Sequence, residues 1–441
     1  MDSTSSAQPI AGTKGLVVAA TSSGSGKTTL VLGLLRALAR QGVAVTGAKC
    51  GPDYIDPRFH QAACGKACPN LDSWAMSPAR IAQICPRDDV VIVEGVMGLF
   101  DGSLGGRGST AELAKALGFR VVLVVDCARM AQSVAAVVGG FLGHDGGLEF
   151  AGVILNNLGS ARHERLLREA LAPLDVRVLG AVYRAPALVM PSRHLGLVQA
   201  QERPDLDQFI EHAADHVAAS CDLQALQALA KAGPIQRAAA PRLRPPAQSI
   251  AVAQDAAFAF AYPHILDDWR RAGAEISLFS PLADQPPPAA EMIYLPGGYP
   301  ELFAGQLASA QAFRAAMRSA AGAGTQIYGE CGGYMSLGDG LVDADGKRHQ
   351  MLGLLRLETS FAKPRLHLGY RRLVAGQGPF AGRWAAHEFH YATTIRADGP
   401  AMFDAFDAQG DALAPMGLVN GAVSGSFAHL IDALASPDDV H

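Results

Sequence analysis

Residues 21–29 form a glycine- and serine-rich segment that could hold the phosphates of a nucleotide. They read Thr-Ser-Ser-Gly-Ser-Gly-Lys-Thr-Thr, follow the apolar run Leu16–Ala20 and precede a helical run. Small residues let backbone N–H groups curl around phosphate oxygens at a helix N-terminus, Lys27 supplies positive charge, and Thr28 offers a hydroxyl to Mg²⁺. Thr21 stands where the phosphate-loop pattern has its first glycine, and a flexible turn is the alternative. The predicted nucleotide-binding residues are Ser23, Gly24, Ser25, Gly26, Lys27, Thr28 and Thr29.

Carboxylates follow two apolar runs and could bind a metal ion. The segment Lys49–Asp56 comes just after the predicted strand Val43–Gly47, and a second predicted strand, Val90–Val93, leads into Glu94. In open α/β sheets, ligands bind at the carboxyl ends of the strands, and Mg²⁺ prefers oxygen ligands there. The predicted metal ligands are Thr28, Asp53 and Glu94.

Three polar residues near these segments are open to two interpretations. Asp56 and Asp101 could take part in substrate chemistry, or they could cap turns. Asn156 follows the apolar run Gly152–Leu155 and is the predicted adenine contact through its amide. It could equally be a turn residue, as could Asn157, because asparagine tolerates the left-handed conformation.

Cys331 lies in a second motif, where an apolar run ends in glycines. The segment Gly329–Tyr334 reads Gly-Glu-Cys-Gly-Gly-Tyr after the run Gln326–Tyr328, which is a cysteine version of the G-x-S-x-G nucleophile elbow. The glycines permit a sharp strand-to-helix turn, and the N-terminus of the following helix favours the thiolate. A buried structural cysteine is the alternative. We predict that Cys331 is a nucleophile.

A thiolate that forms an acyl-enzyme also needs a base and an oxyanion hole. His429 is the predicted base, and the predicted oxyanion donors are N–H groups near Gly298 and at Gly332. His387 and His390 are the rival bases. Their spacing also allows a metal pair, but one pair without a third ligand is weak evidence for zinc.

Two α/β domains are expected to position these residues. Short β-rich apolar runs alternate with helical runs on both sides of residues 232–249, and this alternation predicts parallel sheets in both halves. The segment 232–249 is rich in proline and small residues, which cannot sustain a helix or a central strand. We predict a linker there, between domains at 15–231 and 250–437.

Composition excludes several classes of protein. The 441 residues carry a net charge of −4, which gives no general electrostatic attraction for nucleic acid. The polar N-terminus lacks the apolar core of a signal peptide, and apolar runs such as 134–142 are too short to cross a bilayer, so we expect a cytoplasmic protein without membrane partners. Seven cysteines without a C-x-x-C pair argue against a disulfide framework or a structural zinc site.

Five segments together resemble the cobyrinic acid a,c-diamide synthase family, which includes the hydrogenobyrinic acid enzymes of cobalamin biosynthesis. The similarity runs from about Gly15 to Ile431. A phosphate loop alone is common to many ATPases, whereas these segments in this order are highly specific. They are Lys49–Asp56, Glu94–Gly102, Leu295–Glu301, Gly329–Tyr334 and His387–Tyr391.

The resemblance implies an α/β fold with a P-loop domain like dethiobiotin synthetase and a triad-type (class I) glutamine amidotransferase domain. It implies that Cys331 attacks the amide of L-glutamine with His429 as base, and that ammonia travels internally to the first domain. There, ATP and Mg²⁺ convert the a and c acetates of a corrinoid-type macrocyclic polycarboxylic acid to acyl phosphates, which ammonia displaces. The residues that match family positions for Mg²⁺, phosphate and acid-substrate chemistry are Asp53, Tyr54, Asp56, Glu94 and Asp101.

Ile431 is a departure from the wider triad amidotransferases. Many of them carry glutamate two residues after the catalytic histidine, and the vitamin B12 branch shares the departure seen here. We therefore expect a Cys–His dyad whose imidazole is less firmly oriented. A weak stand-alone glutaminase would avoid wasting glutamine before the acid substrate is bound.

Three alternatives stay open. Cobyric acid synthase amidates four other side chains, although the segments 49–56 and 94–102 favour the a,c-diamide branch, and nickel-sirohydrochlorin diamidation is more remote. A protein of a different class would combine a nucleotide switch with an inert partner-binding domain. Such ATPases usually have a second lysine early in the phosphate loop, which residues 21–25 lack. The sequence also leaves open a metal-free or cobalt-containing substrate, and a monomer or a homodimer.

Overall fold

The computed structural model describes residues 13–189, 192–193, 196–197, 200, 203–233 and 240–434. These residues form two compact units, and the main change from the first to the second falls between Ala240 and Pro241. That position lies inside the predicted linker 232–249, of which residues 234–239 lie outside the described residues. The ends of the linker belong to strands, because Ala232 lies in β10 and Ser249 in β11.

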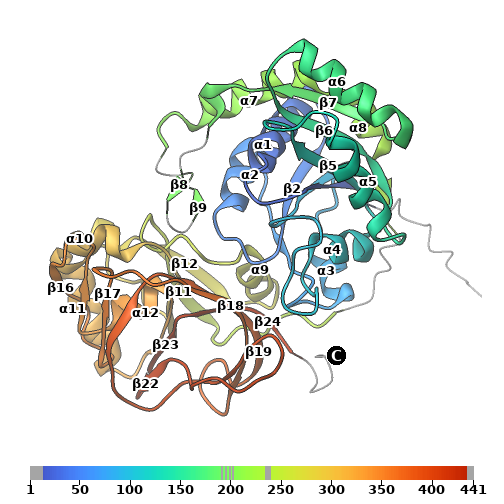
Figure 1. Cartoon of the computed structure of the whole chain (residues 1–441). Coiled ribbons are helices and arrows are strands. Elements are labelled where there is room, and N and C mark those ends of the chain that lie inside the picture. The colour runs from blue at the N-terminus through green and yellow to red at the C-terminus, as the bar shows by residue number, and fades with distance from the viewer. Residues whose placement is uncertain are drawn as a thin grey trace, which may run out of the picture. The chain divides into compact units, whose positions relative to one another are not determined.

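The first unit is built on an eight-stranded sheet with the order β3-β2-β4-β1-β5-β6-β7 (Figure 1). Its seven ordered strands are parallel, and a short strand, β10, pairs antiparallel with β1. Central strands such as β1 are almost fully buried, as the apolar runs of the sequence predict. The strands are β1 (Lys14–Ala20), β2 (Val45–Cys50), β3 (Asn70–Leu71), β4 (Val90–Glu94), β5 (Arg120–Asp126), β6 (Phe150–Leu158), β7 (Val178–Tyr183) and β10 (Lys231–Ala232).

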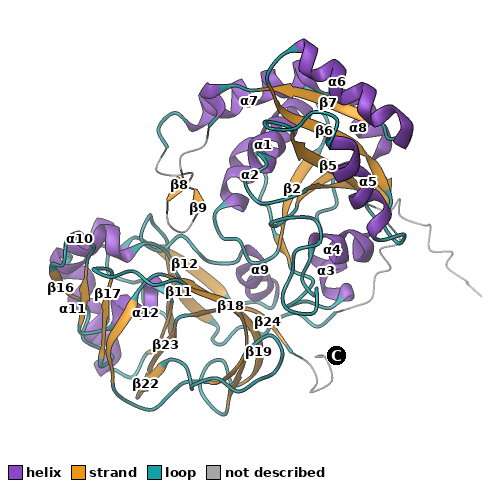
Figure 2. Cartoon of the chain, in the orientation of Figure 1, coloured by secondary structure: helices purple, strands orange, loops and turns teal. Residues whose placement is uncertain are grey.

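Helices cover both faces of this sheet (Figure 2). Helices α1, α2 and α7 pack against one another, and Gly33 allows the close approach of α1, since a Cβ there would lie 2.6 Å from the carbonyl oxygen of Ala213 in α7. A separate two-stranded sheet, which pairs β8 (Ser192–Arg193) with β9 (Gly196–Leu197), is grouped with the second unit. The helices are α1 (Lys27–Arg40), α2 (Asp56–Cys64), α3 (Pro78–Ile84), α4 (Thr110–Leu117), α5 (Val134–His144), α6 (Ala161–Leu171), α7 (Leu206–Ser220) and α8 (Leu223–Leu229).

The second unit has a six-stranded sheet with the order β12-β11-β13-β14-β23-β22, parallel except for the edge strand β22. Its core packs helices α10 to α12 against the buried residues of β11, β13 and β14. The strands are β11 (Ser249–Ala253), β12 (Glu275–Phe279), β13 (Met292–Leu295), β14 (Gln326–Glu330), β22 (Leu418–Asn420) and β23 (Val423–Ser426). The helices are α9 (Pro263–Arg271), α10 (Ala304–Ser309), α11 (Gln311–Gly322) and α12 (Gly332–Leu337).

Two further four-stranded sheets in this unit, with the orders β16-β15-β17-β20 and β21-β18-β19-β24, pair mostly antiparallel and were not predicted. Several of their strands are short or half exposed, so they lack the long apolar runs that identify the parallel strands. The strands are β15 (Gly340–Val342), β16 (Arg348–Gln350), β17 (Leu357–Ser360), β18 (His367–Ala375), β19 (Gly382–His390), β20 (Thr393–Ala397), β21 (Asp404–Phe406) and β24 (Ala428–Ala433).

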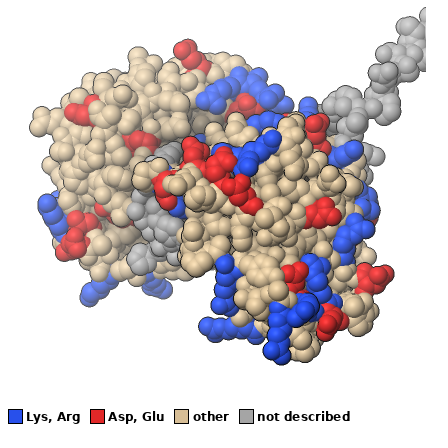
Figure 3. Space-filling model, turned by 90° about the horizontal axis from the view of Figure 1, so that it is seen from above, with Lys and Arg blue, Asp and Glu red and all other residues tan. Residues whose placement is uncertain are grey.

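The next two features are the distribution of charge on the surface and the length of the apolar helices. On the face seen in Figure 3, basic and acidic side chains are interspersed among a majority of uncharged residues. Among the described residues, no helix has the length and apolar character needed to cross a membrane. The α/β fold class predicted from the sequence is confirmed, including the parallel sheets of both halves.

Candidate active sites

The predicted phosphate loop joins β1 to α1. Gly24 and Gly26 have positive φ values of 77° and 84°, a region that favours glycine. The amide nitrogen of Asn156 donates to the carbonyl of Ser25 at 2.8 Å, and a Cβ on Gly26 would lie only 2.4 Å from that nitrogen. Asn156 therefore holds the loop in this structure, and its predicted contact with adenine stays a prediction.

Thr21 replaces the first glycine of the loop without backbone strain. Five non-glycine residues in the described part of the chain have positive φ, and Thr21 is not one of them. Its N–H donates to the carbonyl of Val124 in β5 at 3.3 Å, which ties the start of the loop to the sheet. The departure from the phosphate-loop pattern is thus compatible with the loop's conformation.

Lys27 points back across the phosphate loop. Its ammonium donates to the carbonyl of Met97 at 2.5 Å and to that of Ser22 at 3.5 Å. Burial lowers the pKa of this lysine, although the nearby Glu94 carboxylate opposes the shift. The ammonium lies beside the loop, where the phosphate-loop pattern requires it.

Glu94, at the carboxyl end of β4, is the centre of a buried cluster of charged and polar side chains. One carboxylate oxygen accepts from the hydroxyl of Thr28 at 2.7 Å and from the ammonium of Lys49 at 3.0 Å, while the other is 2.6 Å from Nε2 of His60. Lys49 also donates to Asp56. We call this group the Glu94 cluster: Thr28, Lys49, Asp53, Asp56, His60 and Glu94.

Opposite charges stabilise the ionised forms inside the Glu94 cluster. Burial alone would raise the pKa of Glu94, but Lys49, His60 and Thr28 outweigh it and hold that pKa below its usual range. Burial would lower the pKa of Lys49, yet Asp56 and Glu94 raise it above its ordinary value. For Asp56, burial and the neighbouring Asp53 raise the pKa. Lys49 and Glu94 are thus the members of the cluster whose charged forms are stabilised, whereas the surroundings of Asp56 favour its protonated form.

Asp53 and Asp56 have different surroundings in the structure. Asp53 caps the start of α2, because its carboxylate accepts from the N–H groups of Ile55 and Asp56 at 2.8 and 3.1 Å. The other oxygen of Asp53 lies 4.0 Å from the ammonium of Lys49. Asp56, which seemed suited to capping, is instead buried in the ion pair with Lys49.

Asp101 and Tyr54 differ in their surroundings. Asp101 is exposed, and its carboxylate accepts from the N–H of Gly98 at 2.8 Å, so it makes the turn contact that was its alternative role. Tyr54 is buried next to the start of α2. Their roles in substrate chemistry stay predictions.

The oxygen donors of the Glu94 cluster fit Mg²⁺. The hydroxyl of Thr28 and the nearer oxygen of Glu94 are 2.7 Å apart. Two adjacent oxygens around an octahedral Mg²⁺ lie about 3 Å apart, because each Mg–O bond is about 2.1 Å long. Asp53 could supply a third ligand through the oxygen that does not cap α2. Thr28, Glu94 and Asp53 are therefore the residues that would hold the ion.

Lys49 and His60 were missed as members of this site. Lys49 begins the acidic segment, but β2 extends to Cys50 rather than ending at Gly47, so this lysine projects from the strand itself. His60 lies one helical turn after Asp56 in α2, and that spacing was the available signal. Both contact Glu94, which is far from them in the sequence.

Cys331 occupies a strained turn between β14 and α12. Its φ of 45° and ψ of −103° are unusual for a residue with a side chain. The flanking glycines are needed here, since a Cβ on Gly333 would lie 1.9 Å from the carbonyl oxygen of Leu295, and one on Gly329 would lie 2.7 Å from the carbonyl carbon of Gly333. This is the geometry of a nucleophile elbow.

The expected thiolate at Cys331 is not what the structure favours. The side chain is buried, and burial together with the carboxylates of Glu301, Glu330 and Glu388 raises the pKa of the thiol above its ordinary value. The following helix α12 has only six residues and does not compensate. The thiol lies 3.9 Å from the carbonyl of Phe389, to which it donates. Burial therefore favours the protonated thiol, which needs a base before it can attack.

His429 and Cys331 meet at Gly297. A Cβ on Gly297 would lie 2.2 Å from Cε1 of His429, 3.0 Å from its Nε2 and 3.3 Å from Cβ of Cys331. The predicted oxyanion donors also lie together, since a Cβ on Gly332 would be 2.9 Å from the nitrogen of Gly298. Burial and then His387 and His390 lower the pKa of His429 to about 3, so its imidazole is neutral and able to accept a proton.

The rival histidines belong to β19. His387 faces His429 across the β19–β24 pair, and His390 stacks on Phe427 with ring centroids 4.0 Å apart. Because they are three positions apart along a strand, their side chains leave opposite faces and do not form a metal pair.

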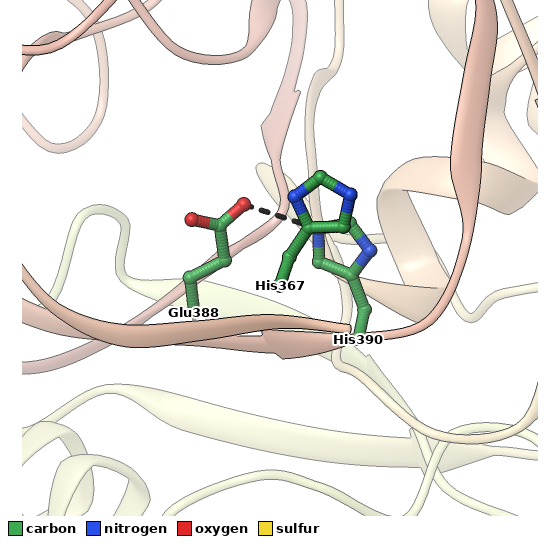
Figure 4. Close-up of side chains that lie close together, drawn as sticks. All are labelled: His367, Glu388 and His390. Atoms are coloured by element: carbon green, nitrogen blue, oxygen red, sulfur yellow. Dashed lines mark hydrogen bonds and ion pairs between the residues drawn. The ribbon is translucent and has the colours of Figure 1, made fainter. Parts of the chain in front are cut away.

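His390 does lie near His367 and Glu388, with possible ligand atoms within 4.8 Å of one another (Figure 4). The two imidazoles stack nearly parallel, with an interplanar angle of 8°, so their in-plane lone pairs do not converge on one point. Arg371 also forms an ion pair with Glu388 at 2.7 Å, which neutralises the carboxylate. This arrangement favours a hydrogen-bonded support for the sheet over a metal centre.

Comparison with known proteins places this architecture in a family. A model described as the CobQ/CobB/MinD/ParA nucleotide binding domain matches residues 16–198, and one described as the CobB/CobQ-like glutamine amidotransferase domain matches residues 249–434. A Sinorhizobium sp protein named hydrogenobyrinate a,c-diamide synthase is 55% identical over 428 residues, spanning 95% of this chain and 98% of that protein. The chain belongs to the hydrogenobyrinate a,c-diamide synthase family.

Two other relatives with this name support the assignment to the hydrogenobyrinate a,c-diamide synthase family. The proteins of Rhizobium meliloti and Rhodobacter capsulatus are 54% and 51% identical, over 95% of this chain and 99% of each protein. The resemblance found in the sequence and the expected enzyme class, a carbon–nitrogen ligase that uses glutamine, are thereby confirmed. An inert partner-binding second half does not fit a chain with a glutamine amidotransferase domain.

Proposed function

We propose that this protein amidates the a and c acetates of hydrogenobyrinic acid, using ATP and glutamine, in cobalamin biosynthesis. The observation that carries the proposal is the 55% identity to a hydrogenobyrinate a,c-diamide synthase over 95% of the chain. The metal-free acid, which that relative's name specifies, is the proposed substrate. The proposed division of labour follows the predicted domains, with ATP chemistry in 15–231 and glutamine hydrolysis in 250–437.

In the second domain, Cys331 attacks the amide carbon of glutamine and His429 takes the thiol proton. The N–H groups of Gly298 and Gly332 receive the oxyanion, and the proton on His429 passes to the departing ammonia. Water then hydrolyses the thioester to glutamate and regenerates Cys331. This assignment is supported by the elbow conformation of Cys331 and by the position of Cys331 and His429 on either side of the space beside Gly297.

In the first domain, the phosphate loop from Ser23 to Thr29 binds ATP, and Lys27 contacts the phosphates. Mg²⁺ held by Thr28, Glu94 and Asp53 would neutralise charge on those phosphates. A substrate carboxylate attacks the γ-phosphorus and ADP leaves; ammonia then attacks the acyl phosphate carbon and phosphate leaves. Residues proposed to serve substrate and phosphate chemistry are Asp53, Tyr54, Asp56 and Asp101.

Counting amide groups by mass tests this function. The protein would be incubated with ATP, Mg²⁺, isotope-labelled glutamine and either hydrogenobyrinic acid or its cobalt form. Two labelled amides on the metal-free acid are expected. Two amides only on the cobalt form would correct the substrate, four would indicate cobyric acid synthase chemistry, and none on either acid would overturn the proposal.

A further inference from the structure

Ile431 occupies the position where many triad amidotransferases carry a glutamate, and it cannot orient a histidine. It is fully buried in β24, and its carbonyl accepts from Nε2 of His264 at 2.8 Å. A catalytic imidazole without an acidic partner has no fixed tautomer. A triad at this site would need another carboxylate close to Nδ1 of His429.

Glu330 is such a residue, and it comes directly before Cys331 in the chain. Its carboxylate is buried, and Oε2 lies 3.7 Å from Nδ1 of His429. The other oxygen, Oε1, accepts from the backbone N–H of Leu430 at 3.1 Å, which fixes Glu330 to the strand that carries His429.

Two tyrosines hold the same carboxylate in place. The hydroxyl of Tyr294 in β13 donates to Oε2 of Glu330 at 2.7 Å, and that of Tyr328 donates to Oε1 at 3.3 Å. Both phenols are buried. Glu330 is thus anchored from β13, β14 and β24 together, and its position does not depend on one contact.

The imidazole of His429 lies between Glu330 and the nucleophile. Its Nδ1 edge is the one near Glu330, whereas Cε1 and Nε2 are the atoms that a Cβ on Gly297 would meet, beside Cys331. This is the order of groups in a catalytic triad: acid, Nδ1, Nε2 and nucleophile.

We propose that Glu330 is the positioning residue that replaces the missing acid, holding Nδ1 of His429 while Nε2 takes the proton of Cys331. The proposal rests on the glutaminase function assigned above to Cys331 and His429. When glutamine enters, the proton moves from Sγ of Cys331 to Nε2, and the Nδ1–H of the resulting imidazolium is hydrogen-bonded by the Glu330 carboxylate. The separation of 3.7 Å is longer than a hydrogen bond and shortens at that moment.

The raised pKa of Glu330 makes its ability to hold the imidazolium depend on pH near neutrality. Burial raises the pKa of Glu330 to about 7, although Tyr294, Leu430 and Tyr328 oppose the shift. The titratable groups that face this pair are Tyr294 and Tyr328 around Glu330, His387 and His390 around His429, and Cys331, Glu301 and Glu388 around the thiol. Below about pH 7 Glu330 is largely protonated and cannot hold an imidazolium.

The test is the variant Glu330→Gln, assayed with glutamine and with ammonium as the nitrogen source. We expect the glutamine-dependent kcat to fall by about 10²-fold, the KM for glutamine to change less than about threefold, and the ammonium-dependent rate to stay unchanged. The KM for glutamine also reports whether the glutaminase domain of the variant folds. The matched control is Glu358→Gln, which removes another carboxylate of the same unit, one that pairs with exposed Arg348.

The pH profile separates positioning from a structural role. The parent glutamine-dependent kcat should rise as pH increases through about 7, and this rise should disappear in Glu330→Gln. Tyr294→Phe, which removes only one donor to Glu330, should raise the pH at which the rise occurs, because that donor stabilises the ionised carboxylate. An unchanged glutamine-dependent kcat in Glu330→Gln, or an equal loss with ammonium, would overturn the proposal.

Failure of this proposal and failure of the glutaminase function give different results. If Cys331→Ala abolishes glutamine use but Glu330→Gln does not weaken it, only the role of Glu330 is wrong. If Cys331→Ala keeps full glutamine-dependent activity, the glutaminase assignment itself is wrong.

Discussion

The two candidate sites differ in the charge of their side chains at rest. In the Glu94 cluster, Lys49 and Glu94 are ionised and neutralise each other in a buried ion pair. At the thiol site, burial favours a protonated Cys331 and a neutral His429. The first site keeps charge in place before its ligands arrive, and the second develops charge only during reaction.

The difference follows from what each site binds. Phosphates and Mg²⁺ arrive charged, so fixed opposite charges lower the cost of removing them from water. The side-chain amide of glutamine is uncharged. A thiolate present at rest would attack glutamine before the acid substrate is bound. An uncharged resting state agrees with the weak stand-alone glutaminase expected from the sequence.

The largest expected effect comes from Cys331→Ala. Glutamine-dependent amidation should fall by about 10³-fold or more, since no other nucleophile replaces the thiol, while amidation with added ammonium survives. Measuring product from both nitrogen sources checks this, with Cys221→Ala as a control for loss of a thiol in the other unit. Loss with both sources would show that the two sites are not separable.

Lys27→Met should impair only the ATP-dependent reaction of the first domain. Removing the ammonium beside the phosphate loop should lower synthesis by about 10²–10³-fold with either nitrogen source. Glutamine hydrolysis by the second domain should keep its basal rate. Lys115→Met is the matched control, because Lys115 is exposed and pairs with Asp145 at 2.7 Å. Full activity with ammonium would contradict the assignment of Lys27.

Gly297→Ala should impair the thiol site by displacing His429. The new methyl group would lie 2.2 Å from Cε1 of His429, so the imidazole must move, and we expect glutamine-dependent kcat to fall by about 10²-fold. Ammonium-dependent synthesis should not change. Gly305→Ala in α10 serves as the control, since its nearest neighbour would be 3.7 Å away. Equal behaviour of the two variants would place His429 elsewhere during catalysis.

The smallest expected effect is on stability. The folded pKa of Glu330, about 7, is raised above its ordinary value of 4.5, so its contribution to folding is present below pH 4.5 and is lost as pH rises through about 7. Glu330→Gln does not titrate, and its free energy of unfolding should gain roughly 1–3 kcal/mol on the parent across that interval. Urea unfolding followed by tryptophan fluorescence measures this, because Trp269 and Trp384 lie in the second unit. A difference that does not change with pH would contradict the buried carboxylate.

The local motifs of both sites were predictable from the sequence. The loop at 21–29 and the elbow at Cys331 each follow an apolar strand and contain glycines, and such signals need only neighbouring residues. The approach of His429 to Cys331 agrees with the predicted pair. The parallel strands were predictable for the same reason, since their buried runs are continuous in the sequence.

Contacts between distant segments were not predictable. Glu94 contacts Lys49 and His60 only because β2, β4 and α2 lie next to one another in the folded domain. The roles of Asp53 and Asp56 depend on the start of α2, which spacing does not define to one residue. The raised pKa of the thiol depends on burial and on Glu301 and Glu388, far from Cys331 along the chain.

Glu330 and Cys331 are consecutive residues, and this adjacency has an evolutionary consequence. In a triad whose acid follows the histidine, the acid and the nucleophile are encoded far apart, so exchanging the nucleophile's turn between homologues leaves the acid behind. Here one short segment of β14 and its turn would transfer both groups at once. Recombination or grafting of that segment onto a related amidotransferase would carry the acid with the nucleophile, provided that the recipient supplies hydroxyl donors like Tyr294 and Tyr328.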